Sequence, residues 1–168
     1  LDKTQKGRSI QVAFNGILRD EQCQAADELL KHENGILSAT TAFGKTVIAA
    51  KLIAERKVNT LILVHRQQLL TQWTDRLTEF LKIDEVLPAV EKKRGRKKRQ
   101  SVIGLIGAGK KSPCGIVDIA IMQSLSNGGD VLELVKDYGV VIVDECHHVS
   151  AFSFEQILKT VTAKYIYG

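Results

Sequence analysis

Residues 38–46 read Ser38-Ala39-Thr40-Thr41-Ala42-Phe43-Gly44-Lys45-Thr46. An apolar run, Gly35-Ile36-Leu37, leads into this stretch, and a helical pattern over 47–54 follows it. The order predicts a strand, a loop of small residues and a helix. Free backbone N–H groups at the start of such a helix, together with the helix dipole, bind phosphate oxygens.

The ending Gly44-Lys45-Thr46 is typical of a nucleotide-binding phosphate loop. In such a loop Lys45 reaches the β- and γ-phosphates, and the Thr46 hydroxyl binds Mg²⁺. Ala39 stands where the strict pattern has glycine, but the strand before it and the helix after it support the same interpretation. The alternative is an ordinary strand-to-helix turn capped by threonine.

Two adjacent carboxylates, Asp144 and Glu145, follow the apolar run over 140–143. Such a run predicts a central strand buried on both faces, whose carboxyl end lies beside the phosphate loop of a doubly wound sheet. There Asp144 is expected to hold magnesium, largely through water. Glu145 is expected to orient or deprotonate the water that attacks the γ-phosphate. Lys45, Asp144 and Glu145 are thus the predicted catalytic residues.

A second buried strand is predicted over 59–64, followed directly by His65 and Arg66 and then by a helix over 67–81. His65 and Arg66 would lie at the sheet edge where ligands bind, although polar residues there also serve as helix caps. Trp73 falls on the periodic apolar face of the helix. This position favours a place in the core over a role in base stacking.

The other periodic segments complete an alternating pattern of strands and helices. In the segment over 20–31, Cys23, Ala26, Leu29 and Leu30 are predicted to share one helical face. The further elements are a short strand within 9–14, strands over 101–106 and 115–122, a short helix over 131–136, and an apolar strand beginning near Lys164. Gln123 and Ser124 end the strand over 115–122.

A second glycine-rich stretch, Gly104–Lys111, has two glycines at phosphate-loop spacing before a lysine. Lys111 occupies the position of the magnesium-binding hydroxyl, and Pro113 follows where the pattern needs a helix. A strand end and a turn are therefore predicted here.

The composition fits one globular domain, with 44% apolar and 26% charged residues in a chain of 168. No segment reaches the length of a membrane span, and the first residues do not form a signal peptide, so a cytoplasmic protein without membrane association is expected. The three cysteines lack disulfide or zinc spacing. His147 and His148 adjoin Cys146, but adjacent residues point in different directions, so no zinc site is expected.

The net charge of +5 comes from one local run. Lys92–Arg99 holds seven of the 24 basic residues, which leaves 17 against 19 acidic residues elsewhere, a net charge of −2. The segment over 86–100 is predicted to be a basic surface excursion inside a single domain over 1–168. The run suits contact with a nucleic-acid backbone; a solvated loop without a specific partner is the alternative.

From about Leu18 to Gly168 the order of these motifs resembles the first motor domain of superfamily 2 helicases, in the branch that includes type III restriction subunits and XPB-like helicases. The resemblance implies a RecA-like α/β domain with a largely parallel sheet and helices on both faces. It also implies ATP and magnesium as cofactors. The implied nucleotide-binding residues are Arg19, Gln22, Thr41, Ala42, Phe43, Gly44, Lys45 and Thr46.

Individual motifs carry individual implied roles. Leu18-Arg19-Asp20-Glu21-Gln22 resembles the adenine-recognising motif, in which Gln22 reads the base and Arg19 stacks on it. Residues 63–70 and 118–125 resemble two motifs that contact the nucleic-acid backbone, through His65, Arg66, Gln123 and Ser124. Asp144-Glu145-Cys146-His147 resembles the DEAD/DEAH motif, with Thr46 and Asp144 on magnesium and His147 linking the nucleotide state to a partner domain.

Two departures from the family pattern matter. Ala42 stands at a position that is normally glycine, and Phe43 at one that is often small, so weaker phosphate binding is expected. The family also continues into a second RecA-like domain that bears arginine fingers, and this domain is absent here. We therefore expect a fragment that binds nucleotide weakly and hydrolyses it scarcely at all.

The sequence thus predicts the ATP-binding half of an ATP-dependent helicase or translocase that acts on DNA more readily than on RNA. Two alternatives stay open. One is the motor of a restriction or conflict-system nuclease, and the other is a nucleic-acid-binding module with a vestigial nucleotide site.

Overall fold

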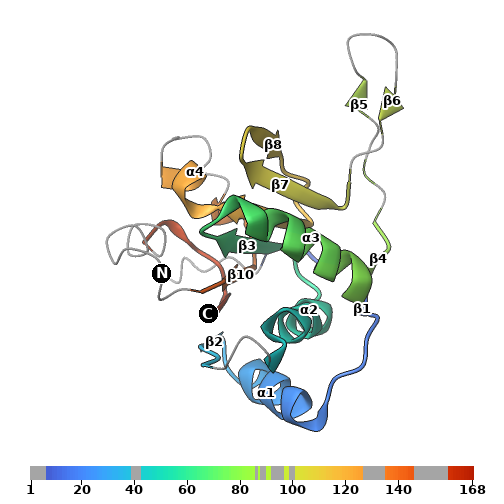
Figure 1. Cartoon of the computed structure of the whole chain (residues 1–168), viewed down its shortest axis with the longest axis vertical. Helices are drawn as coiled ribbons and strands as arrows, with labels where there is room; N and C mark the ends of the chain where they lie inside the picture. Colours follow the sequence, from blue (N-terminus) through green and yellow to red (C-terminus); the bar gives the residue numbers. More distant parts are fainter. Residues whose placement is uncertain are drawn as a thin grey trace.

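The central feature of the computed structural model is a seven-stranded sheet with the order β2-β11-β10-β3-β9-β7-β8 (Figure 1). The structure describes residues 7–38, 43–85, 87, 90–91, 97–98, 101–126, 135–145 and 159–168. The sheet strands are β2 (Asn34–Gly35), β3 (Thr60–Val64), β7 (Ile103–Gly107), β8 (Lys110–Ser112), β9 (Val117–Ile121), β10 (Val140–Val143) and β11 (Tyr165–Tyr167).

The helices and the short outer strands surround this sheet. The helices are α1 (Asp20–Leu30), α2 (Lys45–Arg56), α3 (Gln67–Phe80) and α4 (Met122–Ser126), with a 3₁₀ turn, η2 (Val135–Asp137). Two antiparallel pairs lie outside the sheet: β1 (Val12–Phe14) with β4 (Leu81–Ile83), and β5 (Val90–Glu91) with β6 (Lys97–Lys98). Among the described residues, no helix is long and apolar enough to cross a membrane.

The sheet is parallel except where β7 pairs with β8. The chain forms β2, β3 and β7 first, and later strands fill the gaps between them. β9 lies between β3 and β7, and β10 and β11 lie between β3 and β2. Every residue of β3, β9 and β10 is buried, because both faces of these strands are covered. The predicted α/β class with a largely parallel sheet is confirmed.

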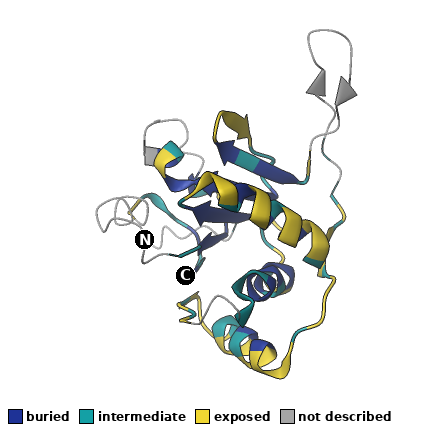
Figure 2. Ribbon diagram, viewed as in Figure 1, coloured by how far each residue is buried: buried dark blue, intermediate teal, exposed yellow. Residues whose placement is uncertain are grey.

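Alternate residues of each central strand pack into two different cores. Ile62 and Val64 face the layer formed by α2 and α3, whereas Leu61 and Leu63 face the layer that contains Leu125 of α4. Figure 2 shows the central strands buried and the outer face of α3 exposed. Helices therefore cover both faces, as predicted.

The stretch over 104–111 contains the end of β7 and a turn, as predicted, and the chain then continues into β8, which completes a hairpin. Residues Gly107 and Lys110 pair across the turn, which places Ala108 and Gly109 at its tip. Both tip residues have positive φ, 51° and 75°, a conformation that suits a tight turn. No helix follows Lys110, so this glycine-rich stretch lacks the helix N-terminus that a phosphate loop requires.

Several predictions about local structure need correction. The strand before residue 38 covers only Asn34–Gly35, and Ile36 beyond it is 76% exposed, because β2 is an edge strand that pairs only with β11 among the described strands. Cys23 is exposed instead of sharing the buried face of α1 with Ala26, since the neighbouring Gln22 takes the buried position. Of the helix predicted over 131–136, residues 131–134 lie outside the described residues, and 135–137 form the 3₁₀ turn.

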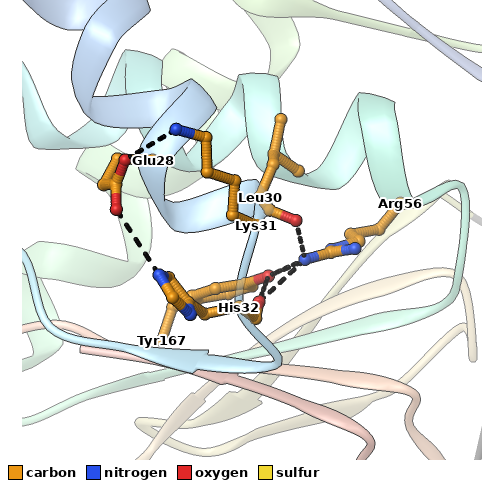
Figure 3. A network of polar contacts seen from close by, with 6 residues as sticks. All are labelled: Glu28, Leu30, Lys31, His32, Arg56 and Tyr167. Carbon is orange, nitrogen blue, oxygen red and sulfur yellow. Dashed lines mark hydrogen bonds and ion pairs between the residues drawn. The ribbon is translucent and has the colours of Figure 1, made fainter.

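Arg56, the last residue of α2, joins three elements at the end of the sheet beside β2 (Figure 3). Its Nη2 donates to the carbonyl oxygens of Leu30 and His32, each at 2.9 Å. Both Nη2 and Nε also donate to the Tyr167 hydroxyl, which in turn donates to the His32 carbonyl at 3.2 Å. The guanidinium carbon lies 4.0 Å from the centre of the Tyr165 ring. Arg56 thereby satisfies carbonyl groups at the end of α1 and fixes β11 against α2.

A buried carboxylate, Asp118 of β9, fixes the segments that pack near Tyr138, on the face of the sheet away from α2 and α3. It accepts hydrogen bonds from the backbone N–H groups of Cys114 and Gly115, at 2.8 and 2.9 Å, and from the Tyr138 hydroxyl. Burial, and then the charge of Asp118, raise the pKa of the Cys114 thiol to about 11. Cys114 is therefore an inert, protonated thiol at neutral pH.

We expect Arg56→Ala to lower the free energy of unfolding by about 2 kcal/mol, because the Leu30 and His32 carbonyls and the Tyr167 hydroxyl lose a charged donor. Urea denaturation measures the change. Arg76→Ala is the matched control, since Arg76 makes one exposed ion pair with Glu79 on α3 and should change stability by less than about 0.5 kcal/mol. Equal losses in the two variants would contradict the role given to Arg56.

Candidate nucleotide site

The start of α2 requires glycine at residue 44. Gly44 precedes the helix with φ of 83°, and a Cβ built on it would lie 2.5 Å from Nε2 of Gln22. Both the backbone conformation and the close approach exclude a side chain. Lys45 and Thr46 then begin α2. The first backbone N–H groups of a helix point out of its N-terminal end, which is the arrangement that phosphate binding requires.

The motif around Arg19 is tied to this same turn. Gln22 is buried, and its Nε2 donates to the Phe43 carbonyl at 2.8 Å. Nη2 of Arg19 donates to the same carbonyl at 3.2 Å, and the backbone N–H of Arg19 donates to Oε1 of Gln22 at 2.9 Å. Arg19 and Gln22, predicted to contact adenine, thus lie beside Phe43 and Gly44. Thr41 and Ala42 lie outside the described residues.

The predicted catalytic residues meet at the carboxyl edge of the sheet. Nζ of Lys45 lies 3.8 Å from Oε1 of Glu145, with both side chains largely buried. The Asp144 backbone N–H donates to the Leu63 carbonyl at 2.9 Å, which extends the pairing of β10 with β3 by one residue. Glu145 has φ of 51°, so the chain turns sharply here. Lys45, Asp144 and Glu145 line one cavity of about 370 Å³.

A second hollow, of about 580 Å³, adjoins the first on the side of α3. Thr46 and Asp144, the predicted magnesium ligands, both line it. A hydroxyl and a carboxylate are hard oxygen donors that suit magnesium. Within the described parts of the chain, no group of three or more His, Cys, Asp or Glu residues could hold a metal ion by itself. Magnesium here would therefore need further oxygens from phosphate and water, as it commonly does.

Trp73 has a contact that sequence reasoning missed. It is 4% exposed, so the predicted core position is confirmed. Its indole Nε1–H also donates to Oδ2 of Asp144 at 2.8 Å. The available signal is general: a buried tryptophan usually finds an acceptor for its N–H. The sequence does not say which acceptor, because Asp144 lies on a distant strand.

The residues predicted to contact nucleic acid also share this edge. β3 and β9 are parallel neighbours with Val64 opposite Ile121, so His65 and Arg66 emerge beside Gln123 and Ser124. Arg66 is exposed and makes no capping hydrogen bond with its side chain, which weakens the alternative that it serves as a cap of α3. His147 lies outside the described residues.

Comparisons with known proteins assign the chain to a family. Residues 15–168 match the family described as "Type III restriction enzyme, res subunit". The DNA 3'-5' translocase XPB2 of Sulfurisphaera tokodaii is 30% identical over 151 residues, covering 90% of this chain and 30% of that protein. The putative helicase 161L of Invertebrate iridescent virus 6 is 30% identical over 163 residues, covering 94% and 34% respectively. The chain thus spans about a third of the length of these curated relatives.

Solved structures share the fold at lower identity. The UvsW helicase from bacteriophage T4 superposes with a TM-score of 0.70 at 21% identity, over 99% of this chain and 56% of that one. The Sulfolobus solfataricus SWI2/SNF2 ATPase core in complex with dsDNA superposes with a TM-score of 0.66 at 12% identity, over 97% and 33%. These likenesses confirm the RecA-like fold.

Gly44→Ala should weaken nucleotide binding by about tenfold or more, because the new methyl group meets Gln22 and the left-handed backbone is strained. Titration with a fluorescent ADP analogue in the presence of Mg²⁺ measures the change. Gly109→Ala is the control: Gly109 also has positive φ, but nothing lies within 4 Å of a Cβ there. Unchanged binding by Gly44→Ala would show that this turn does not shape the site.

Proposed function

Since the chain belongs to the family of the type III restriction enzyme res subunit, we propose that it is the ATP-binding RecA-like domain of an ATP-dependent DNA helicase or translocase. The observation that carries the proposal is the gathering of Lys45, Asp144 and Glu145 around one cavity at the carboxyl edge of the sheet. A cation, a metal-binding carboxylate and a second carboxylate are the groups that phosphoryl transfer to water needs.

Each residue has a distinct role in this proposal. Lys45 binds the β- and γ-phosphates, and Thr46 with Asp144 holds magnesium, which neutralises charge that develops on the phosphates. Glu145 orients and deprotonates the attacking water. The Lys45 ammonium lies 3.8 Å from Oε1 of Glu145, so the proposed phosphate ligand and the proposed base are adjacent. Arg19 and Gln22 contact the adenine base.

The proposed substrate for translocation is nucleic acid. XPB2 is named a DNA translocase, and the SWI2/SNF2 core was solved in complex with dsDNA; both names favour DNA. His65, Arg66, Gln123 and Ser124 would contact the sugar-phosphate backbone, which carries no sequence information. The description of the family also supports a second candidate, the motor of a restriction nuclease.

The full activity is proposed for a longer parent chain. A second RecA-like domain would supply arginine fingers, each worth 10³–10⁵ in turnover in related enzymes, and His147 would relay the nucleotide state to that domain. The chain by itself is therefore expected to bind nucleotide and to turn it over only slowly.

Lys45→Ala should abolish most magnesium-dependent binding of a fluorescent ADP, with a loss of about tenfold or more, because the β-phosphate loses its cation. Fluorescence titration with and without Mg²⁺ measures the loss. Lys51→Ala is the matched control on the same helix. Lys51 does not line the cavity, and its Nζ forms an ion pair with Oε1 of Glu55 at 2.7 Å. Equal losses in both variants would exclude a phosphate-binding role for Lys45.

In the full-length parent, Glu145→Gln should lower the kcat of DNA-stimulated ATP hydrolysis by about 10²–10⁴-fold, because the general base is lost. Nucleotide affinity should not fall, since Lys45, Thr46 and Asp144 are unchanged. Steady-state ATPase assays and nucleotide titration separate the two effects. An unchanged kcat would contradict the role of Glu145 as the general base, whereas absence of DNA-stimulated hydrolysis in the unaltered parent would favour a nucleic-acid-binding module with a vestigial nucleotide site.

A further inference from the structure

The indole N–H of Trp73 donates a hydrogen bond to the Asp144 carboxylate. Asp144 has its backbone fixed by the hydrogen bond to Leu63, so the direction of its carboxylate depends on what its side chain contacts. Nε1 of Trp73 reaches Oδ2 at 2.8 Å from α3, a helix that packs against α2 and β9. We propose that Trp73 is a positioning residue that orients Asp144 for magnesium, a role that rests on the nucleotide site proposed above.

The chemistry of the contact suits this role. An indole N–H is a donor only, and a carboxylate is the stronger acceptor when it is ionised. The bond engages Oδ2, so Oδ1 would be available to hold magnesium or its water. Because Trp73 is 4% exposed, water does not compete well for this hydrogen bond.

The position of the contact supports the same conclusion. Trp73 and Asp144 both line the cavity that contains Lys45 and Glu145, and both also line the hollow that contains Thr46. Asp144 therefore lines both the cavity of the phosphate-binding lysine and the hollow of the metal-binding hydroxyl. The orientation of its carboxylate would decide whether Asp144 and Thr46 could hold one magnesium ion together. Groups that orient a metal ligand in this way typically contribute 10–100-fold to metal affinity.

A packing role alone is the competing explanation, because Trp73 shares the buried stripe of α3 with Leu70 and Leu77. The two explanations assign the role of Trp73 to different parts of the indole. Packing depends on the shape of the indole, whereas positioning depends on its N–H group. An isosteric replacement that removes only the N–H separates them.

The experiment replaces Trp73 in the full-length parent with β-(3-benzothienyl)alanine, which has sulfur in place of the N–H. Magnesium is titrated into the protein with a fluorescent ADP. The apparent Mg²⁺ affinity should fall by about 10–100-fold, while the affinity for ADP without metal changes less than about twofold. Trp73→Phe should show the same loss. Leu70→Met, a conservative change in the same stripe, should leave both affinities unchanged.

A second readout needs no nucleotide. The Trp73 indole resonance, identified by its absence in Trp73→Phe, should exchange with solvent at least tenfold faster in Asp144→Ala, because the acceptor is gone. Unchanged Mg²⁺ affinity after the benzothienyl replacement would overturn the positioning role while leaving the nucleotide site intact. Absence of any magnesium-dependent nucleotide binding in the unaltered parent would instead overturn the proposed function, and this role with it.

Discussion

Parallel pairing of β10 with β3, with Val140 opposite Thr60 and Val143 opposite Leu63, brings two distant parts of the chain to one edge of the sheet. Both strands are buried on both faces, so a slip in register would carry the polar residues that follow them into the core. The hydrogen bond from Asp144 to Leu63 continues the ladder one residue beyond β10. The two carboxylates, the start of α2 and the residues after β3 can meet only because this pairing holds.

The cavity at this edge is bordered by two turns with left-handed backbone. Gly44 supplies one at φ 83°, where a side chain would strike Gln22. Glu145 supplies the other at φ 51°, although it is not a glycine. Glycine adopts this conformation without strain, whereas a glutamate does not. Glu145 is held there by its backbone continuation of β10 and lies 3.8 Å from Lys45, while two hydrogen bonds to the Phe43 carbonyl hold the turn at Gly44.

Sequence periodicity correctly predicted the elements whose buried face is apolar throughout. The unbroken apolar runs of β3 and β10 and the apolar stripe of α3 correspond to buried strands and a half-buried helix, because apolar surface alone decides their position. It failed at Cys23, where the hydrogen bonds of Gln22 to Phe43 and Arg19 turn α1 so that an amide is buried and a thiol is exposed. It also missed the bond from Trp73 to Asp144. Periodicity indicates which face of an element is buried, but not which polar atoms meet across elements.

The place of β11 in the sheet has a consequence for folding order. β11 is the last strand in the sequence, yet it lies between β10 and β2, and among the described strands β2 pairs only with it. Contacts between segments so far apart in sequence form late, because a long loop must close first. During synthesis β2 therefore stays outside the sheet until Tyr165–Tyr167 has left the ribosome. Nascent chains that stop before this strand would expose an unpaired β2 to proteases and chaperones, even when the rest of the sheet has assembled.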